Sequence, residues 1–185
     1  MTSIVVIPGS WRKGSFNASL ARAAVESAPA GCKATLESIR EIPLYDGDVE
    51  AAGIPPAVAK LKDIVAAADG VLLVTPEYNT SIPGTFKNAI DWLSRPPKDI
   101  ERIFSDRPFG LIGATPGRGG TRLAQNAWLP VLRTLGVQLW TGGSLFLADA
   151  GKSFDASGAL TDAKVRELLG KFMQGFAAFV AQRKR

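Results

Sequence analysis

Histidine is absent from this sequence of 185 residues, and cysteine occurs once, as Cys32. Without histidine, the chain cannot assemble a Ser-His-Asp triad or a Cys-His pair, and it lacks the usual ligands of a zinc or copper centre. A single cysteine cannot form an internal disulfide, which fits a reducing compartment. We therefore expect no metal site and no hydrolase chemistry, and we expect the protein in the cytoplasm.

Long apolar stretches and blocks of one charge are also missing. The longest apolar runs, such as residues 176–181, are far shorter than the roughly 20 residues that cross a bilayer. The N-terminus shows no basic segment followed by a long apolar region, so no secretion signal is expected. The formal net charge is +5, but Lys and Arg are dispersed, and the basic residues 182–185 are interpreted as a solvated helix end. We expect no membrane span and no nucleic-acid partner, although a cationic surface would favour small anionic substrates.

The composition is that of an ordinary globular protein. Apolar residues make up 46% of the sequence and charged residues 21%. A chain of this length is long enough to bury one sizeable core. We expect a single domain that covers residues 1–185.

Short apolar runs alternate with helical patterns along the chain. The runs at 4–7, 71–74 and 109–113 end in loops rich in Gly, Pro, Ser and Thr, which is typical of buried strands in a parallel sheet. Less regular segments are placed at the sheet edges: 34–39, and 137–140 together with 144–147. The helical patterns cover 16–28, 56–68, 84–93, 121–135 and a C-terminal segment capped at Thr161.

This alternation predicts an α/β fold. Five strands and five helices without internal repeats indicate a doubly wound parallel sheet with helices on both faces. We expect Pro130 to kink the fourth helix or to move its start, because proline lacks an N–H group and its ring clashes with the preceding turn. Such sheets bind ligands outside the carboxyl ends of their strands, so the loops that follow the central strands are the candidates for a site.

The loop after the first strand has the features of a phosphate cradle. It reads Pro8-Gly9-Ser10-Trp11-Arg12-Lys13-Gly14-Ser15-Phe16-Asn17 and leads directly into a helix, whose N-terminus offers unpaired N–H groups and a positive dipole end. The alternative is a simple turn in which Ser15 or Asn17 caps the helix. The loop is neither a Walker P-loop, since it lacks the spaced Lys-Ser/Thr, nor a G-x-G-x-x-G motif, since Gly9 and Gly14 stand five residues apart.

The loop after the strand at 71–74 carries a more specific pattern. It reads Thr75-Pro76-Glu77-Tyr78-Asn79-Thr80-Ser81-Ile82-Pro83-Gly84. Together with the Gly-Ser-x-Arg-x-x-Ser-x-Asn pattern of the first loop, it resembles the NADPH-dependent FMN reductase family, which includes quinone, chromate and azo-dye reductases. The resemblance spans nearly the entire chain, and it implies a flavodoxin-like fold with a five-stranded parallel sheet in the order 2-1-3-4-5.

The resemblance also assigns the residues that would bind FMN. It implies that the FMN phosphate is held by Ser10, Arg12, Ser15, Phe16 and Asn17. The isoalloxazine and ribityl parts would lie against Pro76, Glu77, Tyr78 and Asn79. A third, Gly-rich loop, residues 114–122, resembles the flavin rim of the family, with Thr115 and Gly117 as the contacts.

The chemistry that the resemblance implies belongs to the flavin, so no catalytic residue is expected. NADPH or NADH would reduce bound FMN by hydride transfer and leave, and a small acceptor would then be reduced in a second half-reaction. Pro76 makes a rigid turn, whose backbone N–H groups could bind the N5 and O4 edge of the flavin. Two alternatives stay open: a non-enzymatic electron carrier like a flavodoxin, and a flavin-binding regulatory protein.

The resemblance implies a homodimer or a homotetramer with the flavin near a subunit boundary. Trp92, Trp128 and Trp140 offer large apolar surfaces that could lie in such an interface, since aromatic side chains are favoured there. Packing of each tryptophan in the core is the alternative.

Overall fold

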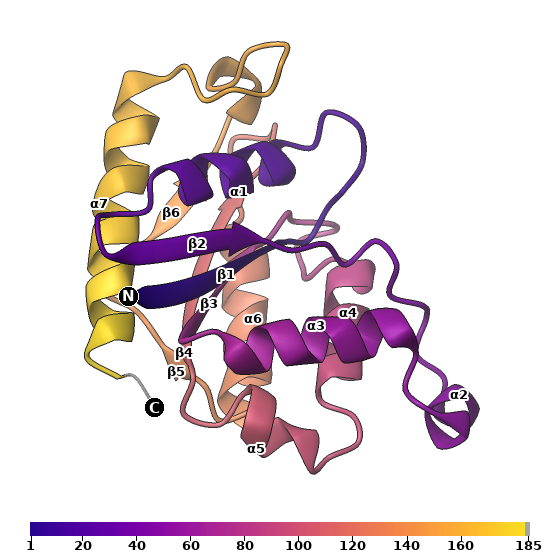
Figure 1. Ribbon diagram of the computed structural model, residues 1–185. Coiled ribbons are helices and arrows are strands. Elements are labelled where there is room, and N and C mark those ends of the chain that lie inside the picture. The colour runs from indigo at the N-terminus through magenta and orange to yellow at the C-terminus, as the bar shows by residue number, and fades with distance from the viewer. Residues whose placement is uncertain (184–185) are drawn as a thin grey trace.

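The computed structural model, which describes residues 1–183, has a parallel β-sheet with helices on both faces (Figure 1). The strand order is β2-β1-β3-β4-β5, and β6 also pairs with β4. The strands are β1 (Thr2–Pro8), β2 (Cys32–Leu36), β3 (Gly70–Val74), β4 (Pro108–Ala114), β5 (Gln138–Leu139) and β6 (Leu145–Leu147). The predicted doubly wound, flavodoxin-like sheet in the order 2-1-3-4-5 is confirmed.

The last predicted strand is in fact two short strands. β5 pairs with the beginning of β4, where Pro108 lies opposite Gln138, and β6 pairs with the end of β4, where Ile112 lies opposite Leu145. Between them the chain passes Gly142 and Gly143, whose missing Cβ atoms would lie within 3 Å of the Trp140 ring. Side chains cannot be accommodated at these positions next to Trp140, and the chain leaves the sheet there before it returns.

The helices agree with the predicted pattern, with two short additions. They are α1 (Phe16–Glu26), α2 (Gly47–Ala52), α3 (Pro56–Ala67), α4 (Gly84–Leu93), α5 (Asp99–Ile103), α6 (Arg122–Thr134) and α7 (Ala163–Ala181). The sequence analysis missed α2 and α5, because helices of six and five residues are too short for a periodic pattern. Asp46 is the N-cap of α2, and its side chain accepts a hydrogen bond from the Asp48 N–H.

Two details of the helices differ from the expectations. The N-cap of α7 is Asp162, not Thr161, and its carboxylate accepts hydrogen bonds from the N–H groups of Lys164 and Val165. Helix α6 runs through the exposed Pro130 and begins at Arg122, so this proline does not displace the start of the helix.

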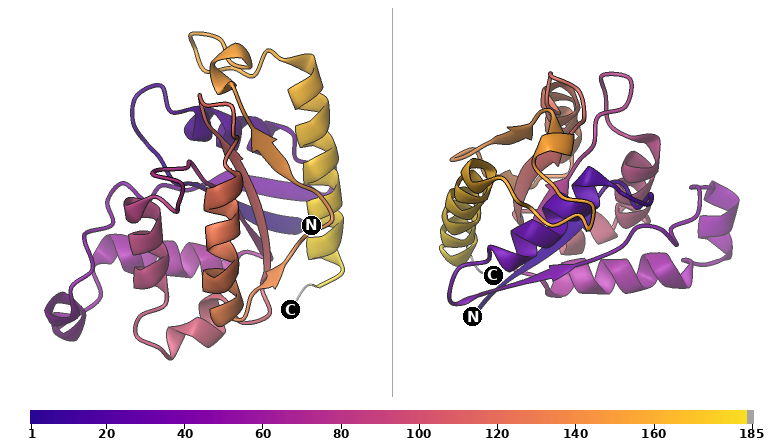
Figure 2. Two further views of the ribbon diagram at one scale, coloured as in Figure 1. Left: turned by 180° about the vertical axis from the view of Figure 1, so that it is seen from behind. Right: turned by 90° about the horizontal axis from the view of Figure 1, so that it is seen from above.

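The core consists of two clusters, one on each face of the sheet. α1 and α7 cover one face, and α3, α4 and α6 cover the other (Figure 2). Trp92 and Trp128 are completely buried in this core, and Trp140 is half-buried against Phe172. The expectation that Trp92 and Trp128 offer surface for an interface is therefore wrong, because both fill the space beneath α4 and α6.

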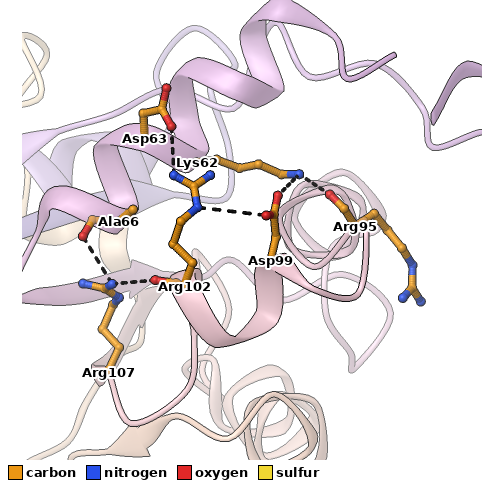
Figure 3. Close-up of polar contacts among 7 residues, drawn as sticks. All are labelled: Lys62, Asp63, Ala66, Arg95, Asp99, Arg102 and Arg107. Atoms are coloured by element: carbon orange, nitrogen blue, oxygen red, sulfur yellow. Dashed lines mark hydrogen bonds and ion pairs between the residues drawn. The ribbon is translucent and has the colours of Figure 1, made fainter. Parts of the chain in front are cut away.

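A polar network joins α3 to α5 and to the start of β4, away from the carboxyl ends of the strands (Figure 3). Lys62 is only 2% exposed, and its Nζ donates to the Asp99 carboxylate at 2.8 Å and to the Arg95 carbonyl oxygen. The buried guanidinium group of Arg107 donates to the backbone carbonyl groups of Ala66 and Arg102. This network fixes α5, a helix too short to be stable by itself.

The sequence predicts neither a membrane span nor a metal site, and the described part of the chain can be compared with both expectations. None of its helices is both long and apolar enough to cross a membrane. Within residues 1–183, no group of three or more His, Cys, Asp or Glu side chains could hold a metal ion. The basic segment 182–185 extends beyond α7, and its last two residues lie outside the described residues.

Candidate functional site

The loops that follow β1, β3 and β4 meet at the carboxyl edge of the sheet. The Gly9 N–H donates to the Val74 carbonyl oxygen at 2.9 Å, and the Thr75 N–H donates to the Ile112 carbonyl oxygen at 2.8 Å. A small cavity of about 50 Å³, which we call the loop hollow, lies where they converge. Nine of the eleven predicted site residues line the loop hollow: Ser10, Arg12, Ser15, Phe16, Asn17, Pro76, Glu77, Tyr78 and Thr115. Asn79 and Gly117 do not line it.

Two glycines allow the loops to approach so closely. A Cβ atom on Gly113, at the end of β4, would lie 2.2 Å from the Thr75 carbonyl oxygen and 2.3 Å from Thr121 Oγ1. A Cβ atom on Gly9 would lie 2.2 Å from the Phe86 ring. Contacts this short are impossible, so both positions require glycine for the observed packing.

The first loop ends in a capped helix whose first N–H groups are free. The Ser15 hydroxyl accepts a hydrogen bond from the Ala18 N–H at 3.3 Å, which confirms Ser15 as the N-cap of α1. No hydrogen bond within residues 1–183 occupies the N–H groups of Phe16 and Asn17. These two donors stand at the positive end of the helix dipole, beside the Ser10 and Ser15 hydroxyls and the exposed Arg12. This donor set fits a terminal phosphate such as that of FMN.

The side chain of Asn17, which was expected to hold the FMN phosphate, instead binds the protein backbone. This buried side chain donates to the Ala114 carbonyl oxygen at 2.8 Å and accepts from the Ala114 N–H at 2.9 Å. The amide thus joins the start of α1 to the end of β4, and only the backbone N–H group of Asn17 is free for a ligand. The side chain therefore sets the distance between the first and third loops.

The second loop is a rigid turn with an exposed tip. Tyr78 and Ser81 exchange two backbone hydrogen bonds, and the residues between them, Asn79 and Thr80, have φ values of 50° and 60°. Such a two-residue turn with positive φ at both positions is usually made by Asn and Gly, so Thr80 is strained there. The turn fixes the position of Tyr78, whose side chain is 48% exposed at the border of the loop hollow.

Glu77 connects the second loop to the third. Its Oε2 atom accepts hydrogen bonds from the N–H groups of Leu123 at 2.9 Å and Ala124 at 3.0 Å, in the first turn of α6. A carboxylate at this position satisfies two unpaired donors and interacts favourably with the helix dipole. Thr121, at the N-cap position of α6, makes no side-chain capping bond, so Glu77 caps the helix from a distant part of the sequence.

We expect replacement of Glu77 by alanine to destabilise the protein by about 1–2 kcal/mol, because two amide donors of α6 would lose their acceptor. Glu77→Gln should have a smaller effect, since the amide oxygen still accepts. Hydrogen exchange measured by NMR should show faster exchange of the Leu123 and Ala124 amides in Glu77→Ala. The exposed Glu26→Ala serves as the control, and equal exchange rates in all variants would refute the capping role.

A second cavity, which we call the side hollow, adjoins the loop hollow and was missed by the sequence analysis. It has a volume of about 530 Å³, and it shares Ser10, Arg12 and Tyr78 with the loop hollow. Its far wall comes from the segment after β2 and from α4, through residues Ile39, Arg40, Ile42, Leu44, Thr85 and Asn88. The rule that ligands bind at carboxyl ends of strands applies to β2 as well, and it could have drawn attention to Arg40.

The segment after β2 is held on α4 by polar contacts. Asn88 accepts from the Tyr45 N–H at 2.8 Å and donates to the Pro43 carbonyl oxygen at 2.7 Å, and the Trp92 indole also donates to that oxygen. Leu44, between them, is 80% exposed at the mouth of the side hollow. A hydrogen bond from the Tyr45 hydroxyl to Glu50 raises the pKa of Tyr45. These contacts give the side hollow a fixed wall.

Comparisons with known proteins by sequence and by structure agree on one family. Residues 2–152 match the family described as NADPH-dependent FMN reductase. An NAD(P)H-dependent FMN reductase of Pseudomonas aeruginosa is 41% identical over 177 residues, which cover 96% of this chain and 94% of the relative. A 2-hydroxy-1,4-benzoquinone reductase of Burkholderia sp is 35% identical over 181 residues, covering 98% and 97%. The solved structure of FerB, a flavoenzyme NAD(P)H:(acceptor) oxidoreductase of Paracoccus denitrificans, has a TM-score of 0.89 and 31% identity, with full coverage of both chains.

Proposed function

Because the chain belongs to the NADPH-dependent FMN reductase family, we propose that it is an oxidoreductase that binds FMN and reduces small acceptors, quinones above all, with NADPH or NADH. The observation that carries this proposal is the convergence of the three loops on one hollow, where the first N–H groups of α1 have no hydrogen-bond partner among the described residues. The residues present at that hollow fit a phosphorylated ring whose reactive part faces the wider side hollow.

Each loop has a distinct part in holding the cofactor. The free N–H groups of Phe16 and Asn17, with Ser10, Ser15 and Arg12, would bind the phosphate. Pro76, the backbone of Glu77 and Tyr78 would support the ring, and Asn79, Thr115 and Gly117 would complete the rim. When bound, FMN supplies the chemistry by accepting a hydride from the nicotinamide and passing the electrons on. The protein would bind and orient the cofactor and its substrates, and no side chain needs to move a proton.

The acceptor would enter through the side hollow. This cavity is open to solvent and bordered by apolar side chains from the segment after β2, including Ile39, Ile42 and Leu44. Such a lining suits a flat, weakly polar molecule, and relatives named quinone reductase occur at 35–37% identity over nearly the whole chain. Chromate, azo compounds and free flavin are the other acceptors to test.

The alternative of a non-enzymatic electron carrier is less well supported. Flavodoxin carriers tend to be strongly acidic, whereas this chain has a formal net charge of +5 and places Arg12 at the phosphate loop. A flavin-binding regulatory protein would need no cavity beside the ring, but the side hollow has a volume of about 530 Å³. Both observations favour an enzyme.

We further propose that the protein works in the cytoplasm as a homodimer or homotetramer. Exposed large apolar side chains support an interface: Leu44 before α2, Val49 on α2, and Leu123 and Leu129 on α6. Figure 1 shows α2 projecting from the body of the molecule, where a second subunit could bury it. A single cysteine and the lack of disulfides are compatible with a reducing compartment.

Reduction under anaerobic conditions tests the proposed function. The purified protein loaded with FMN should be yellow, and its flavin absorbance should bleach on addition of NADPH or NADH and return on addition of benzoquinone. Steady turnover without a second protein separates an enzyme from an electron carrier. A protein that does not bind FMN, or that binds FMN but turns over with none of benzoquinone, free flavin, chromate and an azo dye, would refute the proposed function.

A further inference from the structure

A third cavity lies next to the phosphate loop. It shares Arg12, Ser15 and Phe16 with the loop hollow and otherwise has a lining of its own. It has a volume of about 560 Å³ and is enclosed by the first loop with α1 on one side and by residues 154–158 on the other. Figure 2 shows the latter segment, between β6 and α7, running beside α1. Contacts join the two walls: the Phe16 and Phe154 rings stack at 6.1 Å, and the Gly158 backbone approaches Ser19 and Arg22.

Positive charge dominates this cavity, which we call the cationic hollow. Arg12, Lys13, Arg22 and Arg40 line it, against the single carboxylate of Asp155. None of these four cations takes part in an ion pair within the described part of the chain. Arg22 donates to the Ser19 hydroxyl at 2.9 Å and Arg40 to the Trp11 carbonyl oxygen, so both bind neutral groups and keep further donors available.

The one carboxylate in the lining is already occupied. Asp155 Oδ1 accepts hydrogen bonds from the hydroxyl and N–H groups of Ser157 and from the Ala159 N–H, and these bonds lower the pKa of Asp155. Asp155 thus holds the turn at 155–159, and its single negative charge offsets only one of the four positive charges in the lining. The cationic hollow retains an excess of positive charge that would concentrate anions.

Aromatic surface accompanies this charge. Trp11, Phe16 and Phe154 line the same hollow. The Trp11 indole Nε1 is buried without a hydrogen-bond partner in the described residues. Because buried polar groups are nearly always paired, this donor is an exception in the chain taken alone. Cations beside aromatic rings are the usual combination for binding a phosphate together with a base.

The cationic hollow is continuous with the cavity that the nicotinamide would enter. It shares Trp11, Arg12 and Arg40 with the side hollow, which reaches Tyr78 at the border of the loop hollow. A dinucleotide with its nicotinamide over the flavin could therefore extend along Trp11 toward Arg22. FMN has a single phosphate, for which the first turn of α1 already offers donors, so the remaining cations are available for another ligand.

From this placement we propose that the cationic hollow binds the adenosine 2′-phosphate end of NADPH and makes NADPH, rather than NADH, the preferred electron donor. Lys13, Arg22 and Arg40 contact the phosphate, and Trp11 stacks on the adenine. This inference rests on the proposed function, since it assigns the donor of the same site. Of these residues, Trp11 and Arg40 also line the side hollow, whereas Lys13 and Arg22 line the cationic hollow but neither the side hollow nor the loop hollow.

Calorimetric titration with nucleotide fragments tests the inference independently of turnover. FMN-loaded protein should bind 2′,5′-ADP at least tenfold more tightly than 5′-AMP, and Arg22→Gln should weaken 2′,5′-ADP binding by about tenfold, the loss of one charge-assisted hydrogen bond. Binding of 5′-AMP and of FMN should be unchanged. Arg133→Gln, an exposed arginine in the last turn of α6, is the matched control and should behave as the original protein.

Kinetics give a second measure of the same preference. In Arg22→Gln, the KM for NADPH should rise about tenfold while kcat and all NADH parameters stay the same. Equal affinity for 2′,5′-ADP and 5′-AMP, or an Arg22→Gln variant that matches Arg133→Gln, would overturn the inference. If either result occurred while the protein still bound FMN and turned over with NADH, the inference would be wrong and the proposed function would still hold. Failure to bind FMN would instead refute the proposed function. Titration of 2′,5′-ADP into the FMN-free protein would then still show whether the cationic hollow binds the 2′-phosphate.

Discussion

Gly113→Ala should abolish tight FMN binding and destabilise the protein by about 3 kcal/mol, at the upper end of the range for overpacking. The new methyl group would lie 2.2 Å from the Thr75 carbonyl oxygen, which belongs to the backbone and cannot rotate away. The end of β4 would have to separate from the end of β3, and the second and third loops would separate with it. In thermal unfolding, we expect a decrease of the midpoint by roughly 6–12 °C.

Gly170→Ala is the matched control for this change. Gly170 lies inside α7, and nothing lies within 4 Å of a Cβ atom added there. The same substitution should therefore stabilise the protein by about 0.5–1 kcal/mol through helix propensity and leave FMN affinity unchanged. If Gly113→Ala kept both its melting temperature and its dissociation constant for FMN, measured by fluorescence titration, the loops would not depend on this close approach.

Lys62→Ala should destabilise the protein by about 3 kcal/mol without changing the affinity for FMN. The substitution removes the hydrogen-bond donor of the Arg95 carbonyl oxygen and leaves the Asp99 carboxylate, which is 20% exposed, with only the longer ion pair to Arg102 at 4.0 Å (Figure 3). Removing one partner of a buried ion pair typically has this effect, because the other charge stays largely desolvated. Urea denaturation followed by circular dichroism gives the free energy of unfolding.

Comparison variants identify the cause of the loss. Lys60→Ala, on the exposed side of the same helix, should change the free energy of unfolding by less than about 0.5 kcal/mol. The double variant Lys62→Met with Asp99→Leu should recover most of the stability, since an apolar pair of similar size removes both charges. A Lys62→Ala protein as stable as Lys60→Ala would show that the ion pair contributes nothing.

The network around Lys62 is predicted to contribute to stability alone, whereas the carboxyl edge of the sheet contributes to both stability and FMN binding. The network of Lys62 and Arg107 lies between α3, α5 and the start of β4, whereas the loop hollow lies at the opposite, carboxyl ends of the strands. The two ends are connected through β3 and β4, which are entirely buried. We therefore expect variants of the network to lower the free energy of unfolding without changing FMN affinity, whereas Gly113→Ala should lower both.

The site residues that the sequence identified differ in what each side chain does. The loop hollow is lined by three residues whose polar groups are open to a ligand: Arg12, Ser15 and Tyr78. Asn17 and Glu77 line it too, but their side chains bind Ala114 and the first turn of α6. Substitutions at Asn17 and Glu77 should accordingly affect the spacing of the loops before they affect any direct contact with FMN.

The sequence by itself determined the strands, the long helices, the strand order through its family resemblance and the loops that form the site. It could do so because apolar runs, helix periodicity and loop composition are local properties. Only the tertiary structure decided the burial of Trp92 and Trp128, the pairing of Lys62 with Asp99 and the cap that Glu77 places on α6. These depend on contacts between residues 37 to 53 positions apart, such as Trp128 with Thr75, for which no local pattern exists. The cationic hollow, too, exists only because the fold brings residues 154–158 beside α1.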